Sequence, residues 1–327
     1  MVLMLSRSDL EKLLNMKDVM EYVETAFLEL QSGTAILPMR ATITLAEKHG
    51  WIGIMPAYLG RMGSLSTKIV TVFEKNLEKN MPTIMATIIL NDSETGAPLA
   101  IMDGTLVTAM RTGAVCGVAT KYLARKDSKI IGIFGAGVQA RTQLMAMCVA
   151  RDIKRALVHD IVKERAESFA SEMSEVLRIP VEACEPRELV VQSDIIVTAT
   201  TSKIPVFNGN WVKPGTHLNL IGSFKPDVRE VDETVIKKAK IVVDQKSAAL
   251  EEAGDIIIPL KAGIITEKDI YAELGELAAG LKPGRTSDSE ITLFKSVGLG
   301  IQDCAAAWLA YTRAKEKGVG IEVELFR

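Results

Sequence analysis

The fold of this 327-residue chain is decided by one stretch, Ile130-Ile131-Gly132-Ile133-Phe134-Gly135-Ala136-Gly137-Val138-Gln139-Ala140. Its apolar run 130–134 predicts a buried strand, and a helical pattern follows from Ala140. Gly135 permits a tight turn, Gly137 lets the backbone approach a pyrophosphate, and Ala140 allows close packing of helix on strand. The helix would direct its positive N-terminal end towards the phosphates. This combination predicts the phosphate-binding turn of a dinucleotide site.

An acidic residue supports that interpretation. Asp160 stands twenty residues after Ala140, at the end of the next predicted strand, where an acid accepts hydrogen bonds from the adenosine ribose. Its carboxylate bonds the free 2′-hydroxyl of NAD and repels the 2′-phosphate of NADP. A hydrogen bond to a charged group contributes roughly 1.5–3 kcal/mol, a preference of about tenfold to a hundredfold. We therefore predict NAD as the preferred cofactor, although Lys163 and Arg165 lie close enough in sequence to leave NADP possible.

Working outward, short apolar runs alternate with amphipathic helices through the second half of the chain. Short buried strands alternating with helices indicate a parallel sheet covered on both faces. The pattern predicts a doubly wound Rossmann sheet. Its strands are expected at 130–134, 156–159, 181–184, 195–199, 217–221 and 241–243.

The first hundred residues have a different pattern. Helical spacing covers 8–32, with Ser8 as the expected N-cap and Glu11 completing a capping box. Period-two segments and turn residues then predict strands, and together these elements indicate an α+β domain. The expected strands are 41–45, 51–55, 67–73, 83–90 and 98–103, followed by a helix to about residue 124 and a last helix at 298–317.

Composition excludes several classes of function. Apolar residues make up 48% and charged residues 24%, with a net charge of −2, so the chain has no basic footprint for nucleic acid. The N-terminus lacks the shape of a signal peptide, and no apolar run is long enough for a membrane span. Four scattered cysteines and three histidines form no zinc pattern and no Ser-His triad. We expect a cytoplasmic protein without a metal, whose chemistry depends on a cofactor, carboxylates, lysine or arginine.

Three cations of the first domain stand in apolar or small-residue segments. Lys68 shares a strand face with Val70 and Val72, and a lysine on an apolar face needs an anionic partner. Arg111 lies on a predicted helix, and Arg40 opens a strand. Each alone is more readily explained as a structural salt bridge or a snorkelling side chain. Together with a cofactor site they suggest a pocket for a small carboxylate, which a guanidinium binds through two hydrogen bonds.

These residues occur in an order that resembles the ornithine cyclodeaminase and mu-crystallin family, which also holds archaeal alanine dehydrogenases and reductases of cyclic imino acids. The resemblance covers almost the whole chain. It rests on Pro38-Met39-Arg40, Lys68, Met81-Pro82-Thr83, Asn91-Asp92, Thr95 to Ala100, Met102 to Thr105, Thr108 to Thr112, the glycine turn, and Ser296-Val297-Gly298 through Asp303.

The resemblance implies a discontinuous first domain, 1–117 plus 301–327, that binds substrate and forms a homodimer interface, with the Rossmann domain, 118–300, inserted into it. It also implies that Arg40, Lys68 and Arg111 anchor the substrate carboxylate and are catalytic. Lys68 would in addition polarise or help protonate an imine. The implied cofactor contacts are Thr83, Thr112, Gly135, Gly137, Val138, Gln139, Asp160, Thr200, Gly222, Ser223 and Gly298.

One departure from the family bears on function. Cyclodeaminases have an aspartate after the fifth Rossmann strand, and Phe224 takes its place here, although Asp227 is only three residues further on. Phe224 would instead pack against a substrate ring. We therefore expect a reductase of cyclic imino acids, of the type that converts Δ1-pyrroline-2-carboxylate into L-proline. The alternatives are alanine dehydrogenase, ornithine cyclodeaminase with bound NAD, and a non-catalytic binding protein.

Overall fold

The computed structural model describes residues 1–325 and divides them into two compact units. Unit 1 contains Met1–Arg111 and the chain from Leu299 onwards, and unit 2 is Thr112–Gly298. The predicted domain limits were residues 117/118 and 300/301, whereas the units divide at 111/112 and 298/299. The helix α3 (Gly104–Leu123) contains the first of these divisions.

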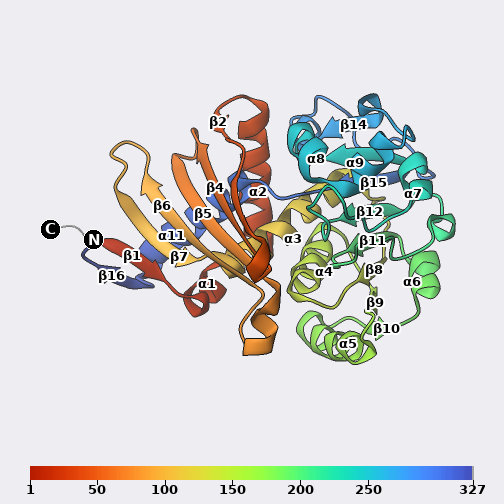
Figure 1. Ribbon diagram of the computed structural model, residues 1–327, viewed down its shortest axis with the longest axis horizontal. Coiled ribbons are helices and arrows are strands. Elements are labelled where there is room, and N and C mark those ends of the chain that lie inside the picture. The colour runs from red at the N-terminus through yellow and green to blue at the C-terminus, as the bar shows by residue number, and fades with distance from the viewer. Residues whose placement is uncertain (326–327) are drawn as a thin grey trace. The chain divides into compact units, whose positions relative to one another are not determined.

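Unit 1 is built on a mixed eight-stranded sheet, sheet A. The pairing of β1 with β7 is parallel and the other pairings are antiparallel. Because β16 pairs with β1, the two ends of the described chain lie at one edge of the sheet (Figure 1). The order is β16 (Ile321–Val323), β1 (Val2–Leu5), β7 (Pro98–Asp103), β6 (Ile84–Asp92), β5 (Ser64–Phe73), β4 (Gly50–Leu59) and β2 (Ala35–Ile36), with β3 (Ala41–Leu45) also on β4.

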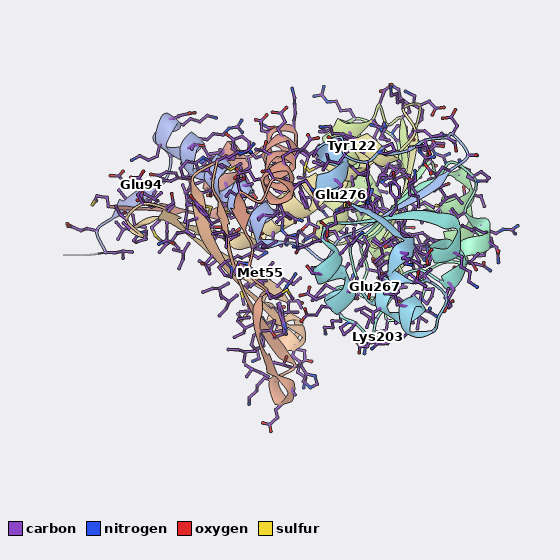
Figure 2. The ribbon with its side chains drawn as sticks, turned by 90° about the horizontal axis from the view of Figure 1, so that it is seen from above. Met55, Glu94, Tyr122, Lys203, Glu267 and Glu276 are labelled. Atoms are coloured by element: carbon purple, nitrogen blue, oxygen red, sulfur yellow. The ribbon has the colours of Figure 1, made fainter. Side chains whose placement is uncertain are left out.

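One face of sheet A is covered by helices. The last helix, α11 (Gly300–Lys317), contacts α2 (Met16–Gln31) and strands β4, β5 and β6. The small cluster of Met55, Val70 and Ala86, with Trp51 packed against it, belongs to the core of this unit (Met55 is labelled in Figure 2). Short 3₁₀ helices, η1 (Ala46–Lys48) and η2 (Glu74–Lys79), complete the unit.

The predicted helix 8–32 is wrong in one respect, since the chain forms two helices there. The first is α1 (Arg7–Leu13), and its N-cap is Ser6 rather than Ser8, in a capping box with Asp9. The second, α2, begins after Asn15, whose side chain accepts a hydrogen bond from the backbone N–H of Asp18. A capping side chain satisfies N–H groups that a continuous helix would bond internally, so the cap at Asn15 marks a new start.

Unit 2 contains sheet B, eight parallel strands, and with it the predicted α/β fold class is confirmed. Chain order reverses between β8 and β11, which is where doubly wound sheets bind ligands. The sequence analysis predicted neither β15, which lies between β12 and β13, nor β14, which lies at one edge of the sheet. The order is β10 (Val181–Ala183), β9 (Arg155–His159), β8 (Ile130–Phe134), β11 (Ile195–Thr198), β12 (His217–Leu220), β15 (Ile291–Lys295), β13 (Ala239–Val243) and β14 (Ile270–Glu273).

Helices lie in the connections between these strands, because parallel neighbours can be joined only by a crossover. Among them α4 and α6 contact β8, and α5 contacts β9. They are α4 (Val138–Ala150), α5 (Lys163–Leu177), α6 (Pro186–Gln192), η3 (Gly209–Trp211), α7 (Glu233–Lys238), α8 (Lys246–Glu252), α9 (Gly254–Lys261), η4 (Glu267–Asp269) and α10 (Leu274–Ala278). In the part of the chain that the structure describes, no helix combines the length and apolarity needed to cross a bilayer.

Candidate functional site

The glycine turn of unit 2 joins β8 to α4. Gly135 has φ +93, and a Cβ there would meet the carbonyl oxygen of Ala199 at 2.6 Å, so only glycine fits. Gly137 is the N-cap of α4, and nothing lies within 4 Å of the Cβ position it leaves empty. The residues therefore form the open turn that the sequence predicts.

The start of α4 fits a phosphate group. In the described structure no side chain caps this helix, so the N–H groups of its first turn, from Val138 onwards, keep their donor capacity. Gln139 follows, and its buried Oε1 has no hydrogen-bond partner among the described residues. Uncapped donors at a helix N-terminus, with space in front of Gly137, are suited to the pyrophosphate of a dinucleotide.

Asp160 lies at the end of β9 and is half-buried. Its Oδ2 accepts a hydrogen bond from the backbone N–H of Ala136 at 2.9 Å, and its Oδ1 accepts one from that of Val162 at 2.9 Å. Each carboxylate oxygen has a further lone pair. Asp160 therefore holds the glycine turn and still has acceptor capacity for ribose hydroxyls.

Four other predicted cofactor residues follow neighbouring strands of sheet B. Thr200 comes after β11, Gly222 and Ser223 come after β12, and Gly298 comes after β15. Parallel strands end at the same edge of a sheet, so these residues share the edge that carries the glycine turn.

The remaining two predicted contacts are placed differently. Thr112 is buried in α3, where its carbonyl accepts a hydrogen bond from Gln143 Nε2 at 2.9 Å. Thr83 belongs to unit 1, and its carbonyl accepts one from the backbone N–H of Phe73 at 2.9 Å. A role of either in cofactor binding stays a prediction.

Unit 1 brings two of the predicted cations to one carboxylate. Lys68 on β5 is 1% exposed, and its Nζ lies 2.6 Å from Asp303 Oδ2. The Nε of Arg111, on α3, lies 3.0 Å from Asp303 Oδ1, and its Nη1 donates to Gln302 Oε1 at 2.6 Å. The anionic partner that Lys68 requires is therefore Asp303, from α11.

The ionisation of Lys68 is strongly perturbed. Burial, and then the charge of Arg111, lower the pKa of its ammonium to about 7, although Asp303 acts in the opposite direction. Arg40 also lowers this pKa, which places its charge within reach of Lys68. A lysine with a pKa near neutrality can both hold and release a proton under working conditions.

Sequence reasoning did not single out Asp303 or Gln302 as functional residues. Both are fully buried on α11, and Gln302 Nε2 has no hydrogen-bond partner among the described residues. The available signal was an acid and an amide among the small apolar residues of the predicted last helix. Polar groups that are buried in this way require partners.

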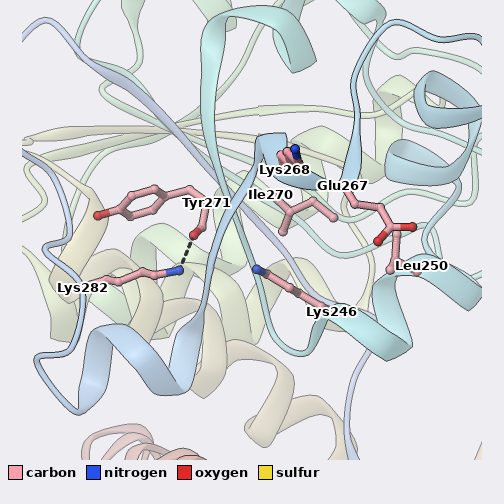
Figure 3. Close-up of a pocket in the computed structure, with 7 residues that line it drawn as sticks. All are labelled: Lys246, Leu250, Glu267, Lys268, Ile270, Tyr271 and Lys282. Carbon is pink, nitrogen blue, oxygen red and sulfur yellow. Dashed lines mark hydrogen bonds between the residues drawn. The ribbon is translucent and has the colours of Figure 1, made fainter.

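A pocket of about 420 Å³ lies elsewhere in unit 2, beside β14 (Figure 3). The strand β14 ends sheet B on the side opposite β9, so this pocket is separate from the glycine turn. There the Nζ of Lys282 donates a hydrogen bond to the carbonyl oxygen of Tyr271 at 2.8 Å. None of the predicted site residues lines it, its lining being Lys246, Leu250, Glu267, Lys268, Ile270, Tyr271 and Lys282.

Comparison with known proteins decides the family. Residues 1–318 match the model of the ornithine cyclodeaminase/mu-crystallin family. The chain belongs to this family. The resemblance that was inferred from the motifs is thus confirmed.

Relatives in this family match nearly the whole chain. The Thermococcus litoralis Δ1-pyrroline-2-carboxylate reductase, solved with NADH and L-proline, is 54% identical and has a TM-score of 0.97, over 98% of this chain and all of that one. An archaeal alanine dehydrogenase dimer with bound NAD is 40% identical, with a TM-score of 0.94, over 99% of both chains. A Δ1-pyrroline-2-carboxylate reductase of Bacillus cereus is 39% identical over 99% of this chain and 100% of its own.

The position at which the sequence is predicted to depart from cyclodeaminases lies after β12. Phe224 is half-buried and Asp227 is exposed, both in unit 2. The exposure of Asp227 gives no support within unit 2 for a bent loop that would carry its carboxylate into the site. The contact of Phe224 with a substrate ring stays a prediction.

Proposed function

We propose that this chain is an NADH-dependent reductase that converts Δ1-pyrroline-2-carboxylate into L-proline. The observation that carries the proposal is the whole-chain similarity to the Thermococcus litoralis reductase, which is described with NADH and L-proline. When bound, the reduced nicotinamide supplies the hydride that the C=N carbon takes up. The expected cofactor and reaction, inferred from the motifs, agree with this relative.

The cation cluster of unit 1 supports an anionic substrate. Asp303 is one carboxylate shared by Lys68 and Arg111, and the charge of Arg40 acts on the same ammonium. Buried positive charge in excess of its counter-ions is costly, and an anion that enters relieves it. We propose that Arg40, Lys68 and Arg111 bind the substrate carboxylate.

Lys68 is also the proposed proton donor. Reduction of a C=N bond places a hydride on carbon and leaves the nitrogen needing one proton if the imine is neutral. An ammonium whose pKa is about 7 transfers a proton more readily than an ordinary lysine. Asp303 stays bonded to Arg111 after that transfer, so its charge is not left without a partner.

We propose that Asp160 selects NADH over NADPH. Its carboxylate keeps acceptor capacity, as described above, and a 2′-phosphate would meet its negative charge. The nearby Lys163 extends into solvent, with 81% of its side chain exposed, and lies 3.5 Å from Glu167. A solvated lysine with its own acidic partner does little to attract a phosphate.

A homodimer is proposed from the open face of sheet A. The helices cover the face that carries Ser66, Lys68 and Val70, and the opposite face presents isoleucines from paired strands. Ile54 pairs with Ile69, which is 40% exposed, and Ile89 pairs with Ile101. An apolar face of this kind is typical of a protein interface, and the archaeal relative is a dimer. Light scattering should give a dimer, and Ile69→Glu should give monomers.

A substrate panel followed at the NADH absorbance tests the reaction. Δ1-Pyrroline-2-carboxylate should oxidise NADH fastest, compared with the six-membered Δ1-piperideine-2-carboxylate and with pyruvate plus ammonia. Fastest turnover of pyruvate plus ammonia would establish the second candidate, alanine dehydrogenase, which the 40% identical archaeal relative favours. Tight binding of the imino acid without turnover would instead indicate a binding protein.

Ornithine provides the test against a cyclodeaminase. Phe224 offers no acid to pair the distal amine of ornithine or to accept its proton, and burying that charge beside an aromatic ring is costly. With NAD present, ornithine should release little ammonia. Proline formation from ornithine at a rate comparable to imine reduction would refute the reductase proposal and implicate Asp227.

We also propose a cytoplasmic location, which rests on the four scattered cysteines of the sequence, as expected in a reducing compartment. Cell fractionation tests it.

A further inference from the structure

A fully buried carboxylate joins the ends of two strands in unit 2. Glu230 is 0% exposed. Its Oε1 accepts hydrogen bonds from the backbone N–H and the hydroxyl of Thr200, each at 2.8 Å. Its Oε2 accepts them from the Thr198 hydroxyl and the Gly222 N–H, also at 2.8 Å. Since Thr198 ends β11, Thr200 follows it and Gly222 follows β12, one side chain clasps two neighbouring segments.

The environment of Glu230 raises the energetic cost of this arrangement. Burial, followed by the negative charge of Asp255, raises the pKa of Glu230, and the charge of Lys295 opposes the rise. Asp255 in turn accepts the backbone N–H of Glu230 at 2.7 Å and the Nζ of Lys295 at 2.9 Å. Lys295 also donates to the carbonyl of Ser223 at 2.6 Å. Glu230, Asp255 and Lys295 each make a hydrogen bond to the segment that follows β12.

Stability by itself does not account for a charge at this position. Apolar residues of similar volume usually stabilise a core as well as a buried ion does. Two of the four donors to Glu230 are backbone N–H groups of irregular segments, which strand pairing leaves without partners. The fit is also tight, because a Cβ on Gly222 would lie 2.4 Å from Glu230 Oε1 and 2.2 Å from the carbonyl oxygen of Thr200.

The position of the clasp in the sheet indicates which half of a cofactor it affects. Asp160, at the end of β9, lies on one side of β8, and β11 and β12 lie on the other. A dinucleotide lies across the point where the strand order reverses, with its adenosine on the side of the ribose-binding acid. The segments that Glu230 holds therefore face the nicotinamide half.

We propose that Glu230 is a positioning residue, which shapes the nicotinamide half of the cofactor site by clasping Thr200 to Gly222. Glu230 does not touch the cofactor. The inference rests on the proposed binding of NAD(H), and it deepens that proposal by dividing the site into two independently held halves.

The test measures the affinities for NADH and for ADP, and the rate of amide hydrogen exchange in the ligand-free protein. In Glu230→Gln, an NH₂ group, which can only donate, replaces one carboxylate oxygen that accepts two hydrogen bonds. The affinity for NADH should therefore fall about tenfold or more. The affinity for ADP, which lacks the nicotinamide half, should change less than about twofold. Amide hydrogen exchange in the ligand-free protein should accelerate at Thr200 and Gly222. Titration calorimetry measures the affinities, and mass spectrometry measures the exchange.

A second variant guards against misfolding of Glu230→Gln. Thr198→Val removes one donor to Glu230 and keeps the side-chain shape, so NADH affinity should fall about threefold to tenfold with ADP affinity unchanged. The matched control is Ser193→Ala, which removes a buried hydroxyl just before β11 that donates to the carbonyl of Leu189 at 2.7 Å. It should change neither affinity.

The outcomes separate the two proposals. If the wild type binds NADH and reduces the imino acid, but both variants keep its ratio of NADH to ADP affinity and its exchange rates, only the clasp is overturned. A wild type that binds no NADH overturns the clasp and the proposed function together.

Discussion

The two units each bury an ionic cluster, and the clusters have opposite compositions. In unit 1 the cations Lys68 and Arg111 share the one carboxylate of Asp303. In unit 2 the ammonium of Lys295 pairs with Asp255, and its charge also acts on the neighbouring carboxylate of Glu230.

The difference lies in what balances the excess charge. The excess carboxylate of unit 2 accepts hydrogen bonds from backbone N–H groups and threonine hydroxyls, so the chain satisfies it internally. The cations of unit 1 crowd together strongly enough for Arg111 and Arg40 both to lower the pKa of Lys68. A cluster satisfied by its own backbone holds structure in place, whereas a cluster with surplus cations is suited to receiving an anionic ligand.

The largest effect should come from replacing Lys68. Lys68→Met removes the proposed proton donor and one carboxylate anchor, so kcat/KM for imino acid reduction should fall by about 10²–10⁴-fold. Steady-state kinetics measures it. Arg111→Lys should not retain activity, because the ammonium cannot reproduce the planar fork. Near-normal turnover in Lys68→Met and Arg40→Ala would contradict the proposal that the cations of unit 1 bind the substrate.

Matched replacements of Lys295 and Lys68 test whether only the cluster of unit 2 holds structure in place. Lys295→Met leaves Asp255 and Glu230 buried without their cation, and the free energy of unfolding should fall by about 3–5 kcal/mol. Lys68→Met leaves Asp303 paired with Arg111 and removes a buried ammonium, so it should cost less than about 1 kcal/mol. Urea unfolding of the ligand-free proteins measures both. Equal losses would mean that Lys68 is a structural ion-pair partner.

Asp160 provides an intermediate case, a carboxylate only partly satisfied by the backbone. Its two bonds, to the N–H groups of Ala136 and Val162, leave lone pairs for a ligand. Asp160→Ala should therefore weaken the use of NADH by about tenfold to a hundredfold and the use of NADPH much less. Kinetics with each cofactor measures the ratio. A wild type that strongly prefers NADPH would contradict this interpretation of Asp160.

The smallest effect concerns pH. If Lys68 donates the proton, the reductase rate should decline as the pH rises through about 7, where its ammonium loses the proton. Asp303 raises this pKa, so Asp303→Asn should lower it and move the decline to a more acidic pH by about one unit or more. The surface variant Asp127→Asn is the control and should leave the profile in place. An unchanged profile in Asp303→Asn would show that another group titrates.

Much of the local structure is predictable from the sequence. The expected strands at 41–45 and 98–103 coincide with β3 and β7, and the glycine turn joins β8 to α4 at the predicted place. These features depend on neighbouring residues, because strand periodicity and turn chemistry act within a few positions. The need of Lys68 for an anion was visible for the same reason, from the alternation of β5.

The tertiary structure alone decided which groups meet. Arg111 and Asp303 are 192 residues apart in the chain, and Glu230 reaches Thr198 across 32 residues. No local pattern encodes such pairs, since they form only when α11 packs on sheet A and when β11 and β12 end side by side. The sequence alone thus determined that a dinucleotide turn and buried cations exist. Folding decided that two cations share one acid and that a buried carboxylate accepts hydrogen bonds from backbone N–H groups and threonine hydroxyls, because charge balance in a core depends on distance in space rather than along the chain.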